Sequence, residues 1–444
     1  MLTVLGRMIA VLSVTCMIAG TSARASQLAL GVAPAYGVLK ADQKQTTWVR
    51  VGLTGFEMRP EVARSPVNVA LVLDRSGSMQ GTKIARAREA AITAINRLRP
   101  DDIVTVVTYD STVEVLVPAT KLTDPQQVID AISRIQASGN TALFAGVSKG
   151  AAELRKFLDQ ERVNRIVLLS DGLANVGPSS PGELAALGAS LRKENIAVST
   201  LGLGLGYNED LMVQLASRSG GNHVFIEEAA ELADVFNREF DDVLSVVAQD
   251  VAVTVTLPEG IRPVRVLGND AEINGRHVVV SLSQIYSEQD RHVVIEVEMP
   301  PTAAGSRLQI SDVVVTYRNM HSQAEDRLTG AVKVAFSDSQ AEIDASLNRK
   351  VMEDVVALVA SENSKLATVW LDRGDVEKAM EVLRGNTLYL QLNAEQLDSS
   401  RLEEYRLRNA RQVQGLEAND TNLSRKLMRG LQFEVDSQQT RGNR

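Results

Sequence analysis

Five oxygen-bearing side chains at three separated places in this chain could bind one divalent cation. The three segments that carry them are Asp74-Arg75-Ser76-Gly77-Ser78, Ser138-Gly139-Asn140-Thr141 and Leu168-Leu169-Ser170-Asp171-Gly172. The candidate ligands are Asp74, Ser76, Ser78, Thr141 and Asp171. All are hard oxygen donors, which favours Mg²⁺ (or Mn²⁺ or Ca²⁺) over zinc and copper. Because only two of the donors are carboxylates, a bound cation would keep positive charge and could accept an acidic group from outside.

The elements that must position these donors are buried strands. Apolar runs typical of strands covered on both faces occupy residues 69–73, 103–107, 166–169 and 196–201. Amphipathic helices are expected between them, such as the one whose apolar residues recur from Ile84 to Leu98. This alternation predicts an α/β, doubly wound parallel sheet of Rossmann-like type. The carboxyl ends of its strands lie on one edge, where ligands bind, so the three segments should meet there.

Residues 66–244 resemble a von Willebrand factor type A (VWA) domain with a metal-ion-dependent adhesion site (MIDAS). The order of strand, Asp-x-Ser-x-Ser loop, helix, threonine loop and strand ending in aspartate agrees with that family. The resemblance implies strand order 3-2-1-4-5-6 with a short antiparallel edge strand, for which residues 113–117 are the candidate. It also implies a non-enzymatic, cation-dependent protein-binding module, similar to exported bacterial proteins that carry such a domain.

Other interpretations of these residues remain open. Serine and aspartate ahead of a helix could cap it, although capping leaves Thr141 and Asp171 unexplained. Gly202-x-Gly204-x-Gly206 lacks the spacing of a dinucleotide fingerprint, so a turn is expected there. The four histidines show no pair at ligand spacing, and ordinary structural roles are expected for His223, His277, His292 and His321.

The flanking segments predict two further regions. Residues 26–65 and 245–338 show period-two strands, with a hairpin at Asn274-Gly275, and predict an antiparallel β-sandwich into which the VWA domain is inserted. The alternative is a separate N-terminal arm. Residues 339–436 predict a helical C-terminal region, with helices near residues 347–361, 365–373, 376–384 and 394–416, and residues 437–444 predict a disordered polar tail.

The first 25 residues predict a signal peptide. Arg7 precedes an apolar stretch from Met8 to Ala19, and Ala23-Arg24-Ala25 is typical of a cleavage site. The apolar stretch is shorter than the roughly 20 residues that span a bilayer, so we expect export to the periplasm or cell surface without a transmembrane segment in the mature chain. The single cysteine, Cys16, lies in this segment, which excludes disulfides from the mature protein. A net charge of −8 argues against nucleic acid as a partner.

The sequence therefore predicts a non-enzymatic module that captures an Asp or Glu of a protein partner through a divalent cation. Two alternatives remain. One is a metal-dependent phosphoester hydrolase, for which no general base is evident in the sequence. The other is an envelope scaffold in which the helical region binds a second protein.

Overall fold

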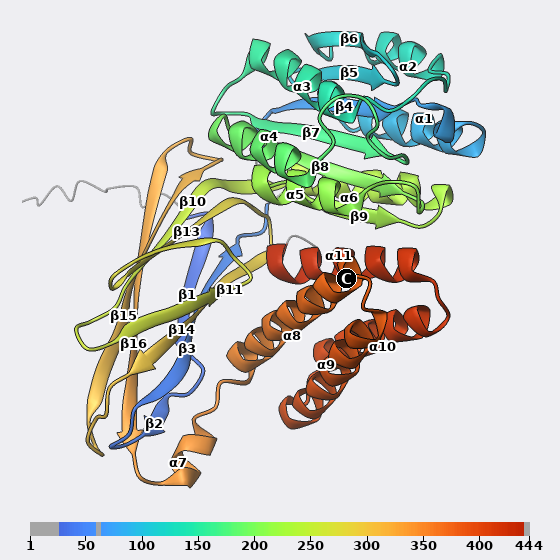
Figure 1. The fold of residues 1–444 in the computed structure, drawn as a ribbon. Coiled ribbons are helices and arrows are strands. Elements are labelled where there is room, and N and C mark those ends of the chain that lie inside the picture. Colours follow the sequence, from blue (N-terminus) through green and yellow to red (C-terminus); the bar gives the residue numbers. More distant parts are fainter. Residues whose placement is uncertain (1–25, 59–63, 439–444) are drawn as a thin grey trace, which may run out of the picture.

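The computed structural model describes residues 26–58 and 64–438, so the predicted signal peptide and Cys16 lie outside the described residues. It consists of an α/β domain, two large β-sheets and a group of C-terminal helices (Figure 1). No helix in the described residues combines the length and apolar character needed to cross a membrane.

The α/β domain is built on one sheet of mostly parallel strands. Its order is β6-β5-β4-β7-β8-β9, and the pairing is parallel except between β5 and β6. The strands are β4 (Val67–Asp74), β5 (Ile103–Tyr109), β6 (Val113–Lys121), β7 (Val163–Ser170), β8 (Ile196–Leu203) and β9 (His223–Ile226). Counted within the domain this is 3-2-1-4-5-6, so the expected order and the antiparallel edge strand are confirmed.

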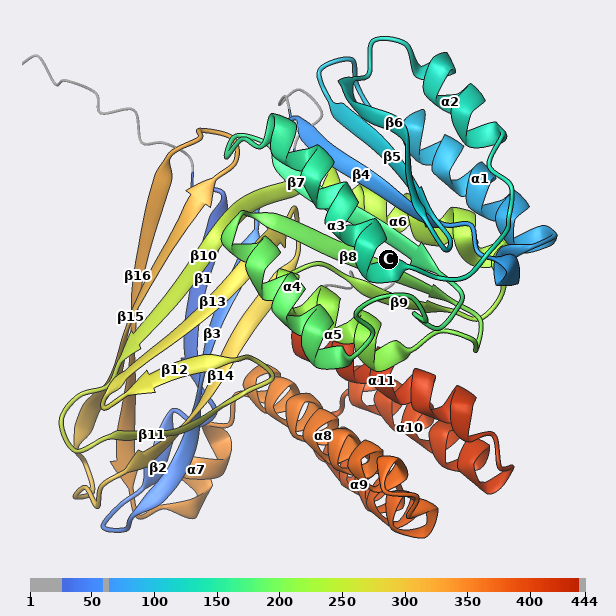
Figure 2. The same cartoon turned by 45° about the horizontal axis from the view of Figure 1, so that its top comes forward.

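Helices cover both faces of this sheet. They are α1 (Thr82–Ile95), α2 (Pro125–Ser133), α3 (Leu143–Leu154), α4 (Pro181–Lys193), α5 (Glu209–Ser219) and α6 (Leu232–Val243). Alternate residues of β4 enter different cores: Val69 and Leu71 pack with α1, α2 and α6, whereas Ala70 and Val72 pack with α3, α4 and α5. Figure 2 shows α3, α4 and α5 on the near face of the sheet. The fully buried strands explain why their sequence is continuously apolar.

The β region combines strands from both sides of the α/β domain. One sheet has the order β1-β3-β14-β11, the other β12-β13-β10-β15-β16-β2, and their residues share a hydrophobic core. The strands are β1 (Leu28–Pro34), β2 (Val38–Lys40), β3 (Gln45–Gly55), β10 (Val246–Thr256), β11 (Arg262–Leu267), β12 (Ala271–Asn274), β13 (His277–Tyr286), β14 (Asp290–Met299), β15 (Arg307–Asn319) and β16 (Glu325–Ser337). Because β3 pairs with β14, the α/β domain is inserted between two parts of one sheet. The pairing of β2 with β16 is parallel, which departs from the expected antiparallel pattern.

The C-terminal region differs from the prediction in three respects. Its helices are α7 (Gln340–Ala345), α8 (Arg349–Asp372), α9 (Val376–Leu397), α10 (Ser400–Glu417) and α11 (Thr421–Ser437). The expected breaks at residues 362–364 and 385–393 are absent, because α8 and α9 run through them, and α7 and α11 were not predicted. The polar tail does not begin at residue 437, since Ser437 ends α11 and the Gln438 side chain accepts from the His292 N–H at 2.6 Å. Residues 439–444 lie outside the described part of the chain.

Candidate metal centre

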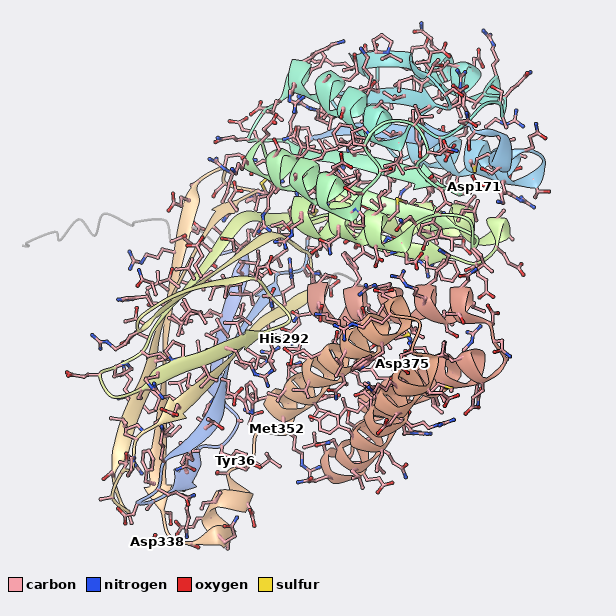
Figure 3. The ribbon with its side chains drawn as sticks, in the orientation of Figure 1. Tyr36, Asp171, His292, Asp338, Met352 and Asp375 are labelled. Carbon is pink, nitrogen blue, oxygen red and sulfur yellow. The ribbon has the colours of Figure 1, made fainter. Side chains whose placement is uncertain are left out.

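The three predicted segments meet at the carboxyl edge of the parallel sheet. Asp74 is the last residue of β4, Asp171 directly follows β7, and Thr141 precedes α3. Backbone hydrogen bonds join the first two loops, from Gly77 N to Gly139 O at 2.9 Å and from Ser138 N to Arg75 O at 2.6 Å. Figure 3 places Asp171 at the end of the α/β domain away from the two β-sheets of the β region.

The hydroxyl and carboxylate oxygens converge within this edge. Ser76 Oγ and Ser78 Oγ are 3.0 Å apart, and Ser78 Oγ donates to Asp171 Oδ1 at 2.6 Å. A Cβ atom placed on Gly172 would lie 3.2 Å from both Ser78 Oγ and Thr141 Oγ1, and 3.9 Å from Ser76 Oγ. The three hydroxyls therefore surround the space that Gly172, by lacking a side chain, leaves open.

Asp74 is a buried carboxylate that holds the loop after β4 and the end of β7 in place. It is fully buried, accepts from the Ser76 N–H at 2.8 Å and accepts from Ser170 Oγ at 2.7 Å. Burial raises the pKa of Asp74, while its hydrogen bonds to Ser76 and Ser170 oppose that rise. Since both carboxylate oxygens already accept hydrogen bonds, Asp74 is suited to orienting the serines and a coordinating water. Ser170 lies in the Leu168–Gly172 segment, but its spacing alone does not indicate a functional role.

Lys83 is a second residue that the sequence did not single out. Its Nζ lies 2.5 Å from Asp171 Oδ2, and Asp171 is 1 % exposed. Lys83 stands on the first turn of α1. It is 88 residues from Asp171 in the sequence, so no local pattern indicates contact between the two. One Asp171 oxygen thus faces the Lys83 ammonium and the other accepts from the Ser78 hydroxyl.

Asn175 supports the threonine loop. Its Oδ1 accepts from the Thr141 N–H at 2.9 Å, and its own N–H donates to Thr141 O at 3.2 Å. These two bonds fix the loop after β7 against the loop before α3. Asn175 had no motif around it that could have indicated this role.

The capping interpretation is wrong. Ser76 precedes the short 3₁₀ helix η1 (Gly77–Met79) but makes no side-chain capping bond, and α1 begins after Gly81, which has no side chain to cap with. The Asp-x-Ser-x-Ser side chains are instead bonded to one another, to the backbone of their own loop and to the segment after β7.

The donor set fits a hard cation. It contains three hydroxyls and two carboxylates from three loops, which suits Mg²⁺ and related ions. Among residues 26–58 and 64–438, no group of three or more His, Cys, Asp or Glu side chains is placed to hold a metal, so the hydroxyls carry the candidate site. Two exposed leucines stand near the site. Leu173, 58 % exposed, follows Asp171 in the loop after β7, and Leu205, 48 % exposed, precedes Gly206 in the loop after β8. The two loops are in contact, since a Cβ atom placed on Gly206 would lie 2.6 Å from the Asp171 carbonyl oxygen.

The other predicted residues lie elsewhere and have structural roles. A Cβ on Gly202 would lie 2.2 Å from the Tyr207 ring, so this glycine makes room for Tyr207 rather than for a nucleotide. His223 Nδ1 lies 2.9 Å from Thr200 Oγ1, and its ring packs edge-on against Phe433 of α11. Burial lowers the pKa of His223 to about 4.

Comparisons with known proteins agree with the α/β fold of this domain. The family model for the von Willebrand factor type A domain matches residues 68–238. A protein of Synechocystis described as uncharacterized, sll0103, is 25 % identical over 331 residues, which cover 72 % of this chain and 78 % of that protein. Mouse inter-alpha-trypsin inhibitor heavy chain H2 is 31 % identical over 168 residues, which cover 35 % of this chain but 17 % of that protein.

A solved structure shares the fold over nearly the whole chain. The ArnB paralog VWA2 from Sulfolobus acidocaldarius has a TM-score of 0.63 and 16 % identity, covering 94 % of this chain and all of that one (100 %). At this identity the likeness concerns the fold alone.

Proposed function

Residues 68–238 form a von Willebrand factor type A domain, and on that premise we propose that the protein is a divalent-cation-dependent protein-binding module. A Mg²⁺ ion, or Mn²⁺ or Ca²⁺, would be held by Ser76, Ser78, Thr141 and Asp171, with Asp74 orienting the serines. An Asp or Glu side chain of the partner would complete the coordination. The observation that carries the proposal is the convergence of three hydroxyls on the space beside Gly172.

The charge of the donor set favours an acidic partner. A divalent cation and the Lys83 ammonium, which is paired with Asp171, together carry more positive charge than the Asp74 and Asp171 carboxylates offset, so the occupied site retains positive charge for a partner carboxylate. The bond is charge-assisted, and in a site shielded from water it is strong.

The surroundings favour a protein rather than a small acid. Leu173 and Leu205 are exposed in loops that border the site. Apolar side chains around a central charged contact are typical of protein interfaces, where they exclude water from the anchoring residue. The 31 % identical inter-alpha-trypsin inhibitor segment spans only 17 % of that protein, so its activity is not carried over to this chain.

The hydrolase alternative has less support. Hydrogen bonds and ion pairs from the five candidate ligands bring in Ser170, Asn175 and Lys83, but no histidine or third carboxylate among the described residues. Lys83 is engaged in an ion pair with Asp171 and does not stand free to act as a general base.

Titration calorimetry with MgCl₂ and MnCl₂ tests the cation site. Wild-type protein should release binding heat that Asp171→Ala abolishes, whereas Asp130→Ala, on the exposed face of α2, should bind as wild type does. Capture of a partner from envelope extract should then require Mg²⁺, disappear with chelator and disappear in Asp171→Ala. Equal Mg²⁺ binding by wild type and Asp171→Ala would disprove the assignment of the site.

We also propose, as a separate part, that the protein is exported to the periplasm or the cell surface. Cell fractionation and N-terminal sequencing of the mature chain would test it. The expected mature N-terminus is Ser26.

A further inference from the structure

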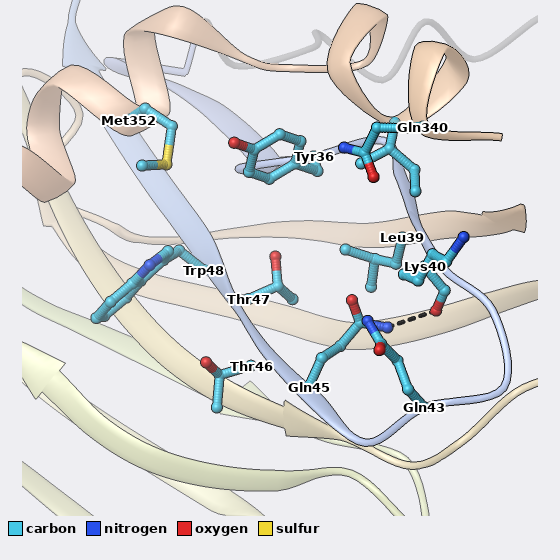
Figure 4. A pocket seen from close by; sticks show the side chains of 11 residues that line it. Tyr36, Leu39, Lys40, Gln43, Gln45, Thr46, Thr47, Trp48, Gln340 and Met352 are labelled. Carbon is cyan, nitrogen blue, oxygen red and sulfur yellow. Dashed lines mark hydrogen bonds between the residues drawn. The ribbon is translucent and has the colours of Figure 1, made fainter. Parts of the chain in front are cut away.

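A pocket of about 490 Å³ opens where the two β-sheets separate, at the edge next to α7 (Figure 4). It exists because β1 and β3 differ in length. β1 ends at Pro34, opposite Val49, while β3 begins at Gln45, and β2 pairs with β16 in the other sheet. Residue 48 is still bonded by the chain after β1, through Ala35 N and Trp48 O at 2.9 Å, but residues 45–47 of β3 lack such a neighbour, and α7 and the start of α8 border the space. The volume falls within the roughly 300–1,000 Å³ typical of small-molecule sites.

The floor of this pocket contains a buried polar atom without a partner. Thr47 is 3 % exposed, and its Oγ1 has no hydrogen-bond partner among the described residues. In Figure 4 this hydroxyl points into the pocket, toward the side on which Tyr36 lies. Buried hydroxyls are generally paired because an unpaired one is costly, so an unpaired hydroxyl aimed into a pocket indicates that a ligand or water pairs with it.

The walls combine aromatic rings with uncharged polar groups. Tyr36 and Trp48 present rings, and Leu39, Ile343 and Met352 add apolar surface. The amides come from Gln43, Gln45 and Gln340. Gln45 donates through Nε2 to Lys40 O at 2.6 Å, which fixes its orientation and leaves its Oε1 as an acceptor. Arg265 lies 5.6 Å from the centroid of the Trp48 ring and helps to hold it.

Formal charge is nearly absent from the lining. None of the lining residues is a carboxylate, and the one amine, Lys40, donates to Asp338 O at 2.7 Å. A cationic ligand would find no counter-charge, and an anion would have to compete for an amine that is already engaged. A purely apolar ligand would leave the buried Thr47 hydroxyl unpaired, which is costly.

We propose that this pocket binds a neutral saccharide. Sugar rings carry apolar C–H faces that pack on Tyr36 and Trp48, and each hydroxyl both donates and accepts, as the glutamine amides and Thr47 do. The pocket is remote from the cation site, since Figure 3 shows Tyr36 and Met352 between the β region and the C-terminal helices, well away from Asp171 in the α/β domain. The protein thus carries two independent binding sites, one for a glycan and one for an acidic protein group.

The direct test is saturation-transfer NMR and calorimetry with a panel of uncharged oligosaccharides: tri-N-acetylchitotriose, cellotriose and maltotriose. At least one should bind the wild-type protein. Thr47→Val, which keeps the side-chain shape but removes the hydroxyl, should weaken that binding at least tenfold. Gln340→Ala, on the exposed helix α7, should weaken it several-fold. Thr329→Val, an exposed strand position on β16, is the matched control and should bind as wild type does.

Thr47→Val also separates loss of the site from loss of the fold. Because it removes an unpaired buried hydroxyl, its thermal unfolding midpoint should equal or exceed that of wild type. Addition of chelator should leave sugar binding unchanged, so failure of the cation proposal would not affect this result. Failure of the whole panel to bind, unaltered sugar affinity in Thr47→Val, or binding of only inorganic phosphate or an extended peptide would overturn the proposal.

Discussion

Lys426 Nζ donates to the backbone carbonyl oxygen of Tyr207 at 2.7 Å, although the two residues are 219 positions apart. The same ammonium lies 2.7 Å from Glu209 Oε2 and 4.0 Å from the centroid of the Tyr207 ring. Gly206, directly before Tyr207, lies so close to Asp171 that an added Cβ would be 2.6 Å from the Asp171 carbonyl oxygen. The last helix therefore holds the loop that packs against the candidate metal centre.

Replacement of Lys426 by methionine should destabilise this contact. Glu209 would remain buried with only Arg425 as its cationic partner, and breaking a buried ion pair costs about 3–5 kcal/mol. We expect a loss of about 3 kcal/mol in urea unfolding. Arg86→Met removes an exposed pair with Glu89 and should cost under about 1 kcal/mol. Similar losses in the two variants would show that Lys426 is not a stabilising anchor.

Gly172→Ala tests the cation site without removing any ligand. The added methyl would lie 3.2 Å from Ser78 Oγ and Thr141 Oγ1, within the space proposed for the cation. We expect Mg²⁺ affinity to fall at least tenfold in calorimetry, with little change in the unfolding midpoint. Gly182→Ala, where a Cβ meets nothing within 4 Å, is the control. Unchanged Mg²⁺ affinity in Gly172→Ala would place the cation elsewhere.

Lys83→Met should strengthen cation binding. The ammonium lies 2.5 Å from Asp171 Oδ2 and repels a nearby cation, an interaction of roughly 1–4 kcal/mol at this kind of partly exposed site. We expect Mg²⁺ affinity to rise about fivefold or more, most clearly at low ionic strength. Lys121→Met, at the exposed end of β6, should leave the affinity unchanged. A fall in affinity would mean that Lys83 is needed to hold Asp171 in place.

Arg165 joins the α/β domain to the β region through a buried polar network. It is fully buried and donates to Ser199 Oγ at 2.8 Å, Gln284 Oε1 at 2.6 Å and Tyr286 OH at 3.1 Å. Arg165→Met would leave these acceptors and Glu239 without their cation, so we expect a loss of about 3–5 kcal/mol in the free energy of unfolding. Arg97→Met, in a partly exposed pair with Asp241, should cost no more than about 1 kcal/mol. Equal losses would remove the case for this network as the link between the two regions.

Mild acid should destabilise the fold through two buried histidines. Burial lowers the pKa of His223 to about 4 and of His292 to about 4, below the value of about 6.5 in an unfolded chain. Between these values the unfolded state binds more protons, so stability falls as pH falls from 6.5 toward 4. By pH 5 each histidine should cost about 2 kcal/mol.

Urea unfolding at pH 7 and pH 5 measures this effect. The buried carboxyl group of Asp74, whose pKa is raised by desolvation, acts in the opposite direction, so the wild-type protein is compared with His223→Gln. The variant should lose less stability between the two pH values than wild type does. Identical losses would show that His223 does not contribute to the pH dependence.

The sequence by itself determined the α/β domain and the identity of the candidate ligands. Val69 to Leu73 and the other apolar runs are continuous because both faces of their strands are buried, and this local property is legible without coordinates. Asp74, Thr141 and Asp171 stand where strands end or helices begin, so parallel pairing of the strands was enough to bring them to one edge.

Only the tertiary structure decided which distant residues support or extend that site. Lys83, Asn175 and Lys426 act through contacts across loops and helices, and no spacing in the chain encodes such contacts. The unpaired Thr47 hydroxyl is likewise apparent only in the structure, where β1 stops short of the first residues of β3. Local patterns report the face that a residue buries, whereas the partner it meets there depends on how whole elements pack.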